Sequence, residues 1–283
     1  MKKETVRFFS SVLLAFILSL MLTVLTFLTV IRGTVQNRSF VARQLEKSDY
    51  YQQLKSEIAE EMATYSAIIG FDEAFFEAHL SDSDIRDPII SNLFTVYGEE
   101  AFFTYDKAAF SDALHAAFVA ELTARGNEVS DELSASLQTL ADNCADFYSS
   151  SARLPFVTTL STLMRRINSA VRVGFLYASL LAVFCAAVLL FLGHSARFFS
   201  YACGGAFLTV TVPTAIAAAS GVIARLSIAD AATYSLIQHM AAGIGTRCLI
   251  GGGILLIAAV LFAIVGREKK EPPEAIGVIH RSM

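Results

Sequence analysis

Charged side chains are nearly missing from the four longest apolar stretches of this chain. No Asp, Glu or Lys lies within residues 8–31, 170–192, 198–224 or 245–265, and arginine occurs only at their edges. Proton relays and ion pathways inside a membrane generally depend on such groups. The absence argues against a proton-coupled transporter and against an intramembrane protease.

The usual signatures of enzymes are also lacking. The sequence contains no Walker-type Gly-Lys-Ser/Thr loop, no serine of the nucleophile-elbow type, no His-Glu-x-x-His pattern and no paired-cysteine metal site. We therefore predict no catalytic residue, no cofactor and no metal, and we expect a protein that is not an enzyme.

Cysteine is scarce as well. Only Cys144 lies outside the apolar stretches, so no disulfide can form within the polar part of the chain. That part must be held together by its own hydrophobic core. A domain without disulfides fits a bacterial membrane better than a eukaryotic cell surface. Cys144 continues a helical apolar stripe, and this favours a core role over that of a nucleophile.

The most prominent feature of the sequence is its four long apolar stretches. A helix crosses the hydrocarbon core of a bilayer with about 20 apolar residues, and all four stretches reach that length. We predict an all-α membrane protein with four transmembrane helices and an all-helical extracellular domain inserted between the first and the second. The first stretch is too long for a secretory signal core, so we expect an uncleaved anchor. The predicted segments are a cytoplasmic N-terminus (1–7), the first span (8–31), the extracellular domain (32–169), the second span (170–192), a cytoplasmic turn (193–197), the third span (198–224), a short extracellular segment (225–244), the fourth span (245–265) and a cytoplasmic tail (266–283).

Basic residues determine the predicted orientation, because Lys and Arg are enriched at the cytoplasmic ends of transmembrane helices. Arg7 precedes the first span, Arg197 precedes the third, and Arg267, Lys269 and Lys270 follow the fourth. Both termini are then cytoplasmic, in the plasma membrane of a bacterium. The predicted extracellular domain holds 11 Lys and Arg against 21 Asp and Glu, which argues against nucleic acid as a partner.

Capping residues and apolar spacing predict helices throughout the extracellular domain. Helix starts are expected at Ser48-Asp49, at Asp72 and at the cluster from Ser81 to Asp84. The clearest pair covers 106–126, capped by Asp106, and 130–147, capped by Ser130, and we expect these two helices to pack antiparallel.

The second span is expected to begin outside the membrane. A helix over 156–192 would be roughly 55 Å long at about 1.5 Å per residue. The hydrocarbon core is about 30 Å thick, so the first part of this helix should project from it.

Small residues form a candidate helix-packing stripe on the second span, at Gly174, Ala178, Ala182 and Ala186. Such spacing lets transmembrane helices approach closely. Packing within one chain is the favoured interpretation, and a homo-oligomer interface is the alternative. Pro213 interrupts the third span and is a candidate hinge, with nearby threonines available for the carbonyl that it frees.

Two polar features and one apolar segment allow more than one interpretation. His79 and His115 could form a metal site only through a tertiary contact, and the acidic cluster from Asp82 to Asp87 fits helix capping better than a calcium loop. The segment 225–244 could lie in the membrane interface or dip into it.

Several short motifs give the chain a resemblance. Asn37-Arg38-Ser39-Phe40 is followed by Leu45 and Asp49-Tyr50-Tyr51, Asp84 to Pro88 begin a helix, and Gly126 to Ser130 form a turn. On these residues the chain resembles a family of uncharacterised four-span integral membrane proteins of Gram-positive bacteria. The resemblance implies the architecture given above and brings no activity.

Three functions are compatible with these observations. The favoured hypothesis is a non-enzymatic envelope protein whose extracellular domain binds another membrane or envelope protein, as a sensor, scaffold or accessory subunit. The alternative is a permease-type subunit with the topology of FtsX and MacB type transporters, in which Arg197 and the tail from Arg267 to Lys270 would contact an ATPase. An enzyme acting on lipid or cell wall is the third hypothesis.

Overall fold

The described part of the chain is helical and contains no strand. Its helices form two units, which we call the bundle and the helical domain. The bundle contains the residues up to Ile31, Val171–Ser220 and the residues from Ile244 onward, and the helical domain contains Arg32–Ala170 and Gly221–Gly243. The computed structural model describes residues 3–100, 103–152, 157–192, 195–222, 225 and 231–268.

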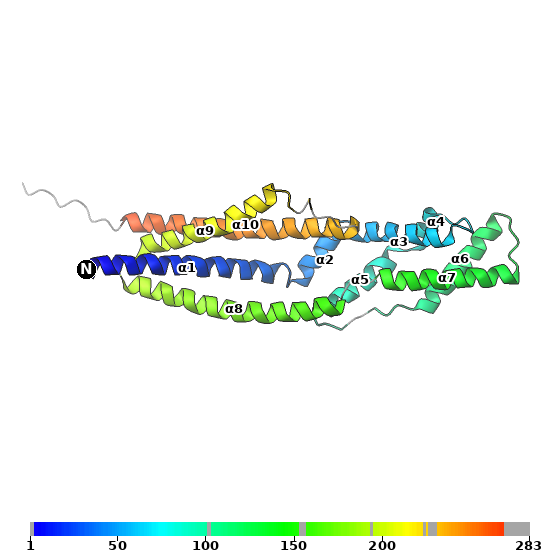
Figure 1. The fold of residues 1–283 in the computed structure, drawn as a ribbon, viewed down its shortest axis with the longest axis horizontal. Coiled ribbons are helices and arrows are strands. Elements are labelled where there is room, and N and C mark those ends of the chain that lie inside the picture. Colours follow the sequence, from blue (N-terminus) through cyan, green and yellow to red (C-terminus); the bar gives the residue numbers. More distant parts are fainter. Residues whose placement is uncertain are drawn as a thin grey trace, which may run out of the picture. The chain divides into compact units, whose positions relative to one another are not determined.

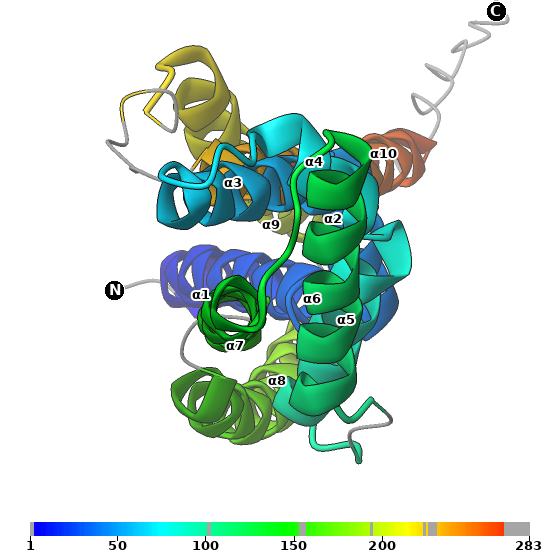
Figure 2. The same ribbon diagram turned by 90° about the vertical axis from the view of Figure 1, so that its right-hand side faces the viewer.

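Four helices are long and apolar enough to cross a membrane, so the chain is a multi-pass membrane protein. Figures 1 and 2 show that, within the bundle, α1 lies between α8 on one side and α9 with α10 on the other. The long helix predicted before the second span is confirmed as α8, although Phe156 lies outside the described residues. The four helices are α1 (Lys3–Gly33), α8 (Val157–Phe191), α9 (Ser195–Ala219) and α10 (Ala231–Glu268).

Glycines bring the helices of the bundle close together. A Cβ atom would lie 3.4 Å from an α1 side chain if added at Gly174 of α8, and 2.7 Å away if added at Gly205 of α9. At Gly251 of α10 the corresponding distance is 2.8 Å. Glycine therefore allows α1 to pack against all three other helices, as small residues do in membranes generally.

The small-residue stripe of α8 faces the inside of the bundle. Ala178 and Ala182 are buried, whereas Gly174 and Ala186 are half-buried. Ala182 belongs to the same apolar cluster as Leu18 of α1. These residues therefore pack within the chain.

Pro213 lies inside α9, and the helix continues through it. Thr211 and Thr214 each donate a hydrogen bond of 2.7 Å to the carbonyl four residues earlier. Both hydroxyls are therefore engaged with their own turns, rather than with the Thr209 carbonyl that the proline frees.

The start of α10 differs from the separate segment expected over 225–244. Residues 231–244 are the first turns of α10, which has no break before Glu268. Ala232 is fully buried in the core of the helical domain, and Ser235 Oγ donates to Ser48 O at 2.9 Å. Apolar residues of this segment are thus used in a protein core. Residues 223–224 and 226–230 lie outside the described part.

Six helices of the helical domain lie between α1 and α8 in the chain. Four of the predicted caps form: Asp72, Ser81, Asp106 and Ser130 each accept a backbone N–H with the side chain. The six are α2 (Arg38–Lys47), α3 (Tyr50–Ser66), α4 (Glu73–His79), α5 (Asp82–Val96), α6 (Lys107–Ala124) and α7 (Asp131–Ser151).

Two details at the start of the helical domain were not predicted. The helix α2 was not among the expected elements, and Asn37 caps it by accepting from Phe40 N at 3.2 Å. Asp49 stands at the N-cap of α3 but makes no side-chain cap bond, because its backbone is left-handed with φ 52°. The predicted cap at Ser48-Asp49 is therefore wrong in its chemistry, although the helix begins there.

A single hydrophobic core holds the helical domain together. Phe118 of α6 is fully buried and stacks on Phe71 and Phe75, with ring centroids 4.6 Å and 5.5 Å away. α6 and α7 pack on each other, as the predicted antiparallel pair requires, and both contribute to this core. The domain needs no disulfide, since buried aromatic and aliphatic side chains supply its stability.

Candidate functional site

A cavity of about 440 Å³ lies in the helical domain. Residues from α4, α5, α6 and α7 and from the segment before α6 line it. A second cavity of about 150 Å³ shares three of the same aromatic residues. The aromatic residues of the first cavity are Phe103, Tyr105, Phe110 and Tyr148, and its polar residues are His79, Asp84, Thr104 and Asp106.

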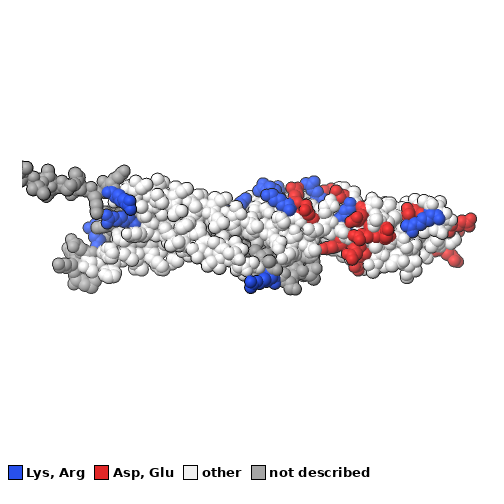
Figure 3. Space-filling view, turned by 90° about the horizontal axis from the view of Figure 1, so that it is seen from above, with Lys and Arg blue, Asp and Glu red and all other residues white. Residues whose placement is uncertain are grey.

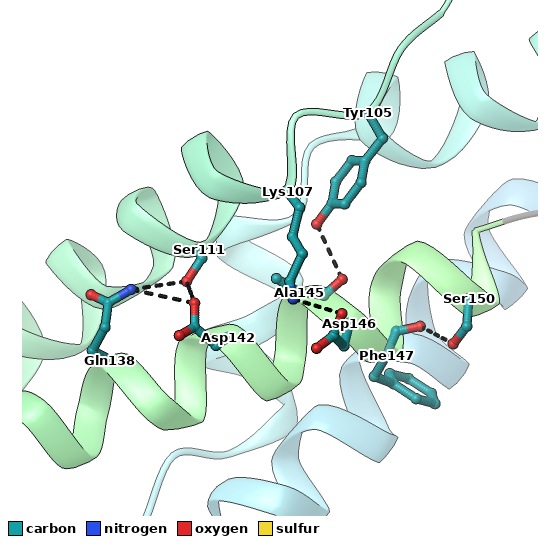
Figure 4. Close-up of polar contacts among 9 residues, drawn as sticks. All are labelled: Tyr105, Lys107, Ser111, Gln138, Asp142, Ala145, Asp146, Phe147 and Ser150. Carbon is teal, nitrogen blue, oxygen red and sulfur yellow. Dashed lines mark hydrogen bonds and ion pairs between the residues drawn. The ribbon is translucent and has the colours of Figure 1, made fainter.

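Polar side chains between α6 and α7 hold the two helices that carry the cavity. Ser111 Oγ donates to Asp142 Oδ1 at 2.6 Å, and Gln138 Nε2 donates to Ser111 Oγ at 3.1 Å (Figure 4). Lys107 Nζ lies 2.7 Å from Asp146 Oδ1, one turn before the serine. These contacts fix the register of α6 on α7. They also fix the position of residues 103–106, which lead into α6.

Three packed aromatic rings form one wall of the cavity. The Tyr148 ring stacks on Phe110, with centroids 4.7 Å apart and an interplanar angle of 16°. The Tyr105 ring lies 5.1 Å from Tyr148, and its hydroxyl donates to Ala145 O at 3.2 Å (Figure 4). Both tyrosine rings are thus held in place by packing and by α7.

A proline explains why the Tyr148 hydroxyl is buried. Pro88 lies inside α5 and has no N–H, so the carbonyl of Asp84, four residues earlier, loses its helical partner. The Tyr148 hydroxyl donates to this carbonyl, and the Tyr148 side chain is only 1% exposed. Pro88 in the sequence indicates that the Asp84 carbonyl lacks its helical partner. No local pattern indicates that the donor is the hydroxyl of Tyr148, 64 residues away.

Both cavity tyrosines stay protonated over a wide pH range. Burial raises the pKa of Tyr105, and the negative charges of Asp146, Asp84 and Asp106 raise it further. Burial also raises the pKa of Tyr148, again with a contribution from Asp84. The nearby carboxylates therefore add to the effect of burial on both tyrosines.

The two histidines considered as metal ligands have different surroundings. His79 lines the cavity, and its Nδ1 lies 2.7 Å from Phe75 O. A carbonyl can only accept, so Nδ1 carries a hydrogen and a neutral ring offers only Nε2 as an acceptor. His115 Nε2 lies 3.2 Å from Ser134 Oγ and does not line the cavity. Among the described residues, no group of three or more His, Cys, Asp and Glu could hold a metal ion.

The acidic cluster at the start of α5 acts in capping. Ser81 Oγ accepts from Asp84 N at 3.2 Å, and Asp84 Oδ2 accepts from Ser81 N at 2.9 Å, which is a capping box. Asp82 Oδ1 lies 3.1 Å from Lys55 Nζ. The preference for capping over a calcium loop is confirmed for Asp84.

Cys144 is fully buried in the core of the helical domain, and burial raises the pKa of its thiol to about 12. The reactive thiolate is therefore rare at pH 8, and we expect Cys144 to react with N-ethylmaleimide roughly 1,000-fold more slowly than an exposed thiol. Mass spectrometry of digests after timed labelling measures this rate. Unfolding in detergent should restore fast labelling, and labelling of the native protein at the exposed-thiol rate would contradict a core role.

Basic residues gather at one end of the bundle. The Arg7 guanidinium donates to Leu192 O, and a Cβ at Gly266 would lie 3.3 Å from Arg197 Cγ. Arg267 follows directly in α10. Figure 3 shows Lys and Arg at this end and a bundle flank almost free of charged residues. The other two predicted cytoplasmic contacts, Lys269 and Lys270, lie outside the described residues.

Comparison with known proteins adds no relative. No family model matches the chain, and neither does a curated protein or a solved structure. The resemblance to four-span proteins of Gram-positive bacteria therefore stays a prediction, and function has to be argued from the geometry alone.

Proposed function

We propose that this chain is a non-enzymatic membrane protein whose helical domain is a binding module, in the manner of a sensor, scaffold or accessory subunit. The cavity carries the proposal. A domain with a complete core of its own leaves an aromatic cavity of about 440 Å³, a size and lining typical of ligand sites. The bundle, by contrast, uses several of its small residues for internal packing, among them Gly205, Gly251 and Gly252.

The proposed orientation places the helical domain outside a bacterial plasma membrane. Arg7, Arg197 and Arg267 lie near one end of the bundle, and basic residues favour the cytoplasmic side. Both termini are then cytoplasmic, and the chain that follows the far end of α1 is extracellular. Removal of Arg7 and Arg197 should weaken this preference.

The permease alternative is less well supported. α8 ends at Phe191 and α9 begins at Ser195, so only three residues join them. A transporter subunit that receives force from a cytoplasmic ATPase needs a surface on that side, and a connection of this length offers little.

Site-specific photocrosslinking in native membranes tests the proposal. Ala113 is exposed on α6 and lines the cavity, whereas Ala135 is exposed on α7 and lines neither described cavity. A photoreactive residue at Ala113 should give an adduct that the same residue at Ala135 does not give. No adduct at Ala113, or identical adducts at both positions, would contradict a site at the cavity. Capture of a cytoplasmic ATPase from position 197 would revive the permease alternative.

A further inference from the structure

We infer that the cavity of the helical domain binds a small protonated amine carried on an apolar stem. The inference rests on the proposed function, because it names the ligand of the same site. It follows from three properties of the described lining residues: the hydrogen-bonding roles still open to them, their charge and the faces of their aromatic rings.

The polar groups of the lining are mainly acceptors. The Tyr105 hydroxyl donates to Ala145 O, so its phenol oxygen can only accept from a ligand. The Tyr148 hydroxyl donates to Asp84 O and Tyr148 is only 1% exposed, so it offers no donor to a ligand. A neutral His79 ring is likewise an acceptor at Nε2, since Nδ1 carries the hydrogen that Phe75 O accepts. Among the described lining residues, Thr104 has the one hydroxyl without this restriction. A ligand that fits must therefore bring donors.

The charge of the lining is negative. Asp84 and Asp106 line the cavity, and no Lys or Arg is among the described residues that do so. One carboxylate oxygen of each is engaged in capping, Asp84 Oδ2 with Ser81 N and Asp106 Oδ1 with Ala109 N. The second oxygen keeps lone pairs that can accept from a ligand. The nearest basic residue along the chain, Lys107, pairs with Asp146.

Aromatic faces complete the recognition of a cation. A positive charge is attracted to the face of Tyr or Phe within about 6 Å of the ring centroid, and three partly exposed residues of this kind, Phe103, Tyr105 and Phe110, line the cavity. The same walls accommodate an apolar stem. The volume of about 440 Å³ lies in the range of small-molecule sites, and it exceeds what one lysine side chain of a protein partner would fill.

Calorimetric titration of the full chain in lipid nanodiscs tests the inference with three probes of one shape. 3-Phenylpropylammonium is a cation at pH 7, 3-phenylpropan-1-ol is neutral, and 3-phenylpropanoate is an anion. We expect the ammonium to bind at least about tenfold more tightly than the alcohol and the carboxylate not to bind. Higher salt should weaken binding of the ammonium and leave that of the alcohol unchanged.

Two matched variants locate the site. Asp106→Asn removes a charge from the cavity and keeps the helix cap, because Asn is as good an N-cap as Asp. Asp72→Asn makes the same change at another N-cap, that of α4, and Asp72 itself does not line the cavity. We expect Asp106→Asn to weaken binding of the ammonium about tenfold and Asp72→Asn to leave it within about twofold.

Other results would overturn the inference. Equal affinity for the ammonium and the alcohol would remove the role of charge, and equal losses in the two variants would place the binding elsewhere. If no probe binds but Ala113 still crosslinks to a protein, the amine ligand is wrong and the binding module stands. If neither probe binding nor crosslinking occurs at the cavity, the proposed function fails as well.

Discussion

Gly252→Ala is expected to destabilise the membrane bundle by about 1–3 kcal/mol, the usual cost of overpacking a filled interior. A Cβ at Gly252 would lie 2.3 Å from Thr211 Cγ2, a separation that two non-bonded carbon atoms cannot keep. Thr211 cannot turn away freely, because its hydroxyl donates to Phe207 O at 2.7 Å and its side chain is branched at Cβ. Either α9 and α10 move apart or the threonine loses its bond.

Two adjacent glycines provide matched controls. A Cβ at Gly253 would meet nothing within 4 Å, so Gly253→Ala should change stability by less than about 0.5 kcal/mol. Gly251 is intermediate, with Thr26 Cγ2 at 2.8 Å. We therefore expect the loss of stability to fall in the order Gly252, Gly251, Gly253, which neither hydropathy nor the distance from the helix ends would predict.

Buried thiols provide the measurement. Cys203 and Cys248 are buried in the bundle, so the rate at which a thiol reagent labels them reports opening of the bundle. A destabilisation of about 1–3 kcal/mol corresponds to roughly 5- to 150-fold faster labelling. Thr211→Ser removes the obstructing methyl and keeps the hydroxyl, and should rescue Gly252→Ala. Equal effects of alanine at positions 252 and 253 would show that α9 and α10 do not pack as described.

Local patterns in the sequence predicted those elements whose causes lie within a few residues. Four caps formed where Ser or Asp precedes an apolar run, and Gly70, Gly98 and Gly126 all have φ 82° at helix ends. The four spans follow from hydrophobic length in the same way. Each of these features depends on residue types that lie within a short stretch of the chain, so the sequence alone is enough to predict it.

Tertiary contacts caused the failures. Segment 225–244 was expected to lie in the membrane interface or to dip into the membrane, because the sequence shows no other partner for its apolar side chains. Ala232 and Leu236 instead pack in the core of the helical domain. Asp49 has the residue type of a cap, but its left-handed backbone prevents that role.

The cavity could not be predicted for the same reason. Phe103, Tyr105 and Phe110 are close in sequence and all line the cavity, but Tyr148 joins them only through the packing of α7 on α6. The hydrogen bond from Tyr105 to Ala145 spans 40 residues, and no local pattern indicates it.

Tyr148→Phe is expected to destabilise the helical domain by about 1–3 kcal/mol, although it removes only one oxygen atom. The hydroxyl donates to Asp84 O, which Pro88 leaves without its helical N–H. Removing the hydroxyl leaves the carbonyl of the half-buried Asp84 without this donor, and an acceptor left unpaired is the costly half of a broken hydrogen bond. Tyr65→Phe is the control, because Tyr65 is 50% exposed, and it should cost less than about 0.5 kcal/mol.

A double-mutant cycle separates this mechanism from a simple loss of packing. Pro88→Ala restores an N–H four residues after Asp84, so the helix itself can pair the carbonyl and Tyr148→Phe should then cost less than about 0.5 kcal/mol. Labelling of Cys144, the only thiol of the helical domain, measures its opening and should leave the bundle thiols unchanged. If Tyr148→Phe costs the same in the natural chain and in the Pro88→Ala background, the proline has no part in the role of Tyr148. A coupling of about 1 kcal/mol or more instead shows that a proline in α5 is tolerated because α7 supplies the missing donor, which ties the wall of the cavity to the stability of the domain.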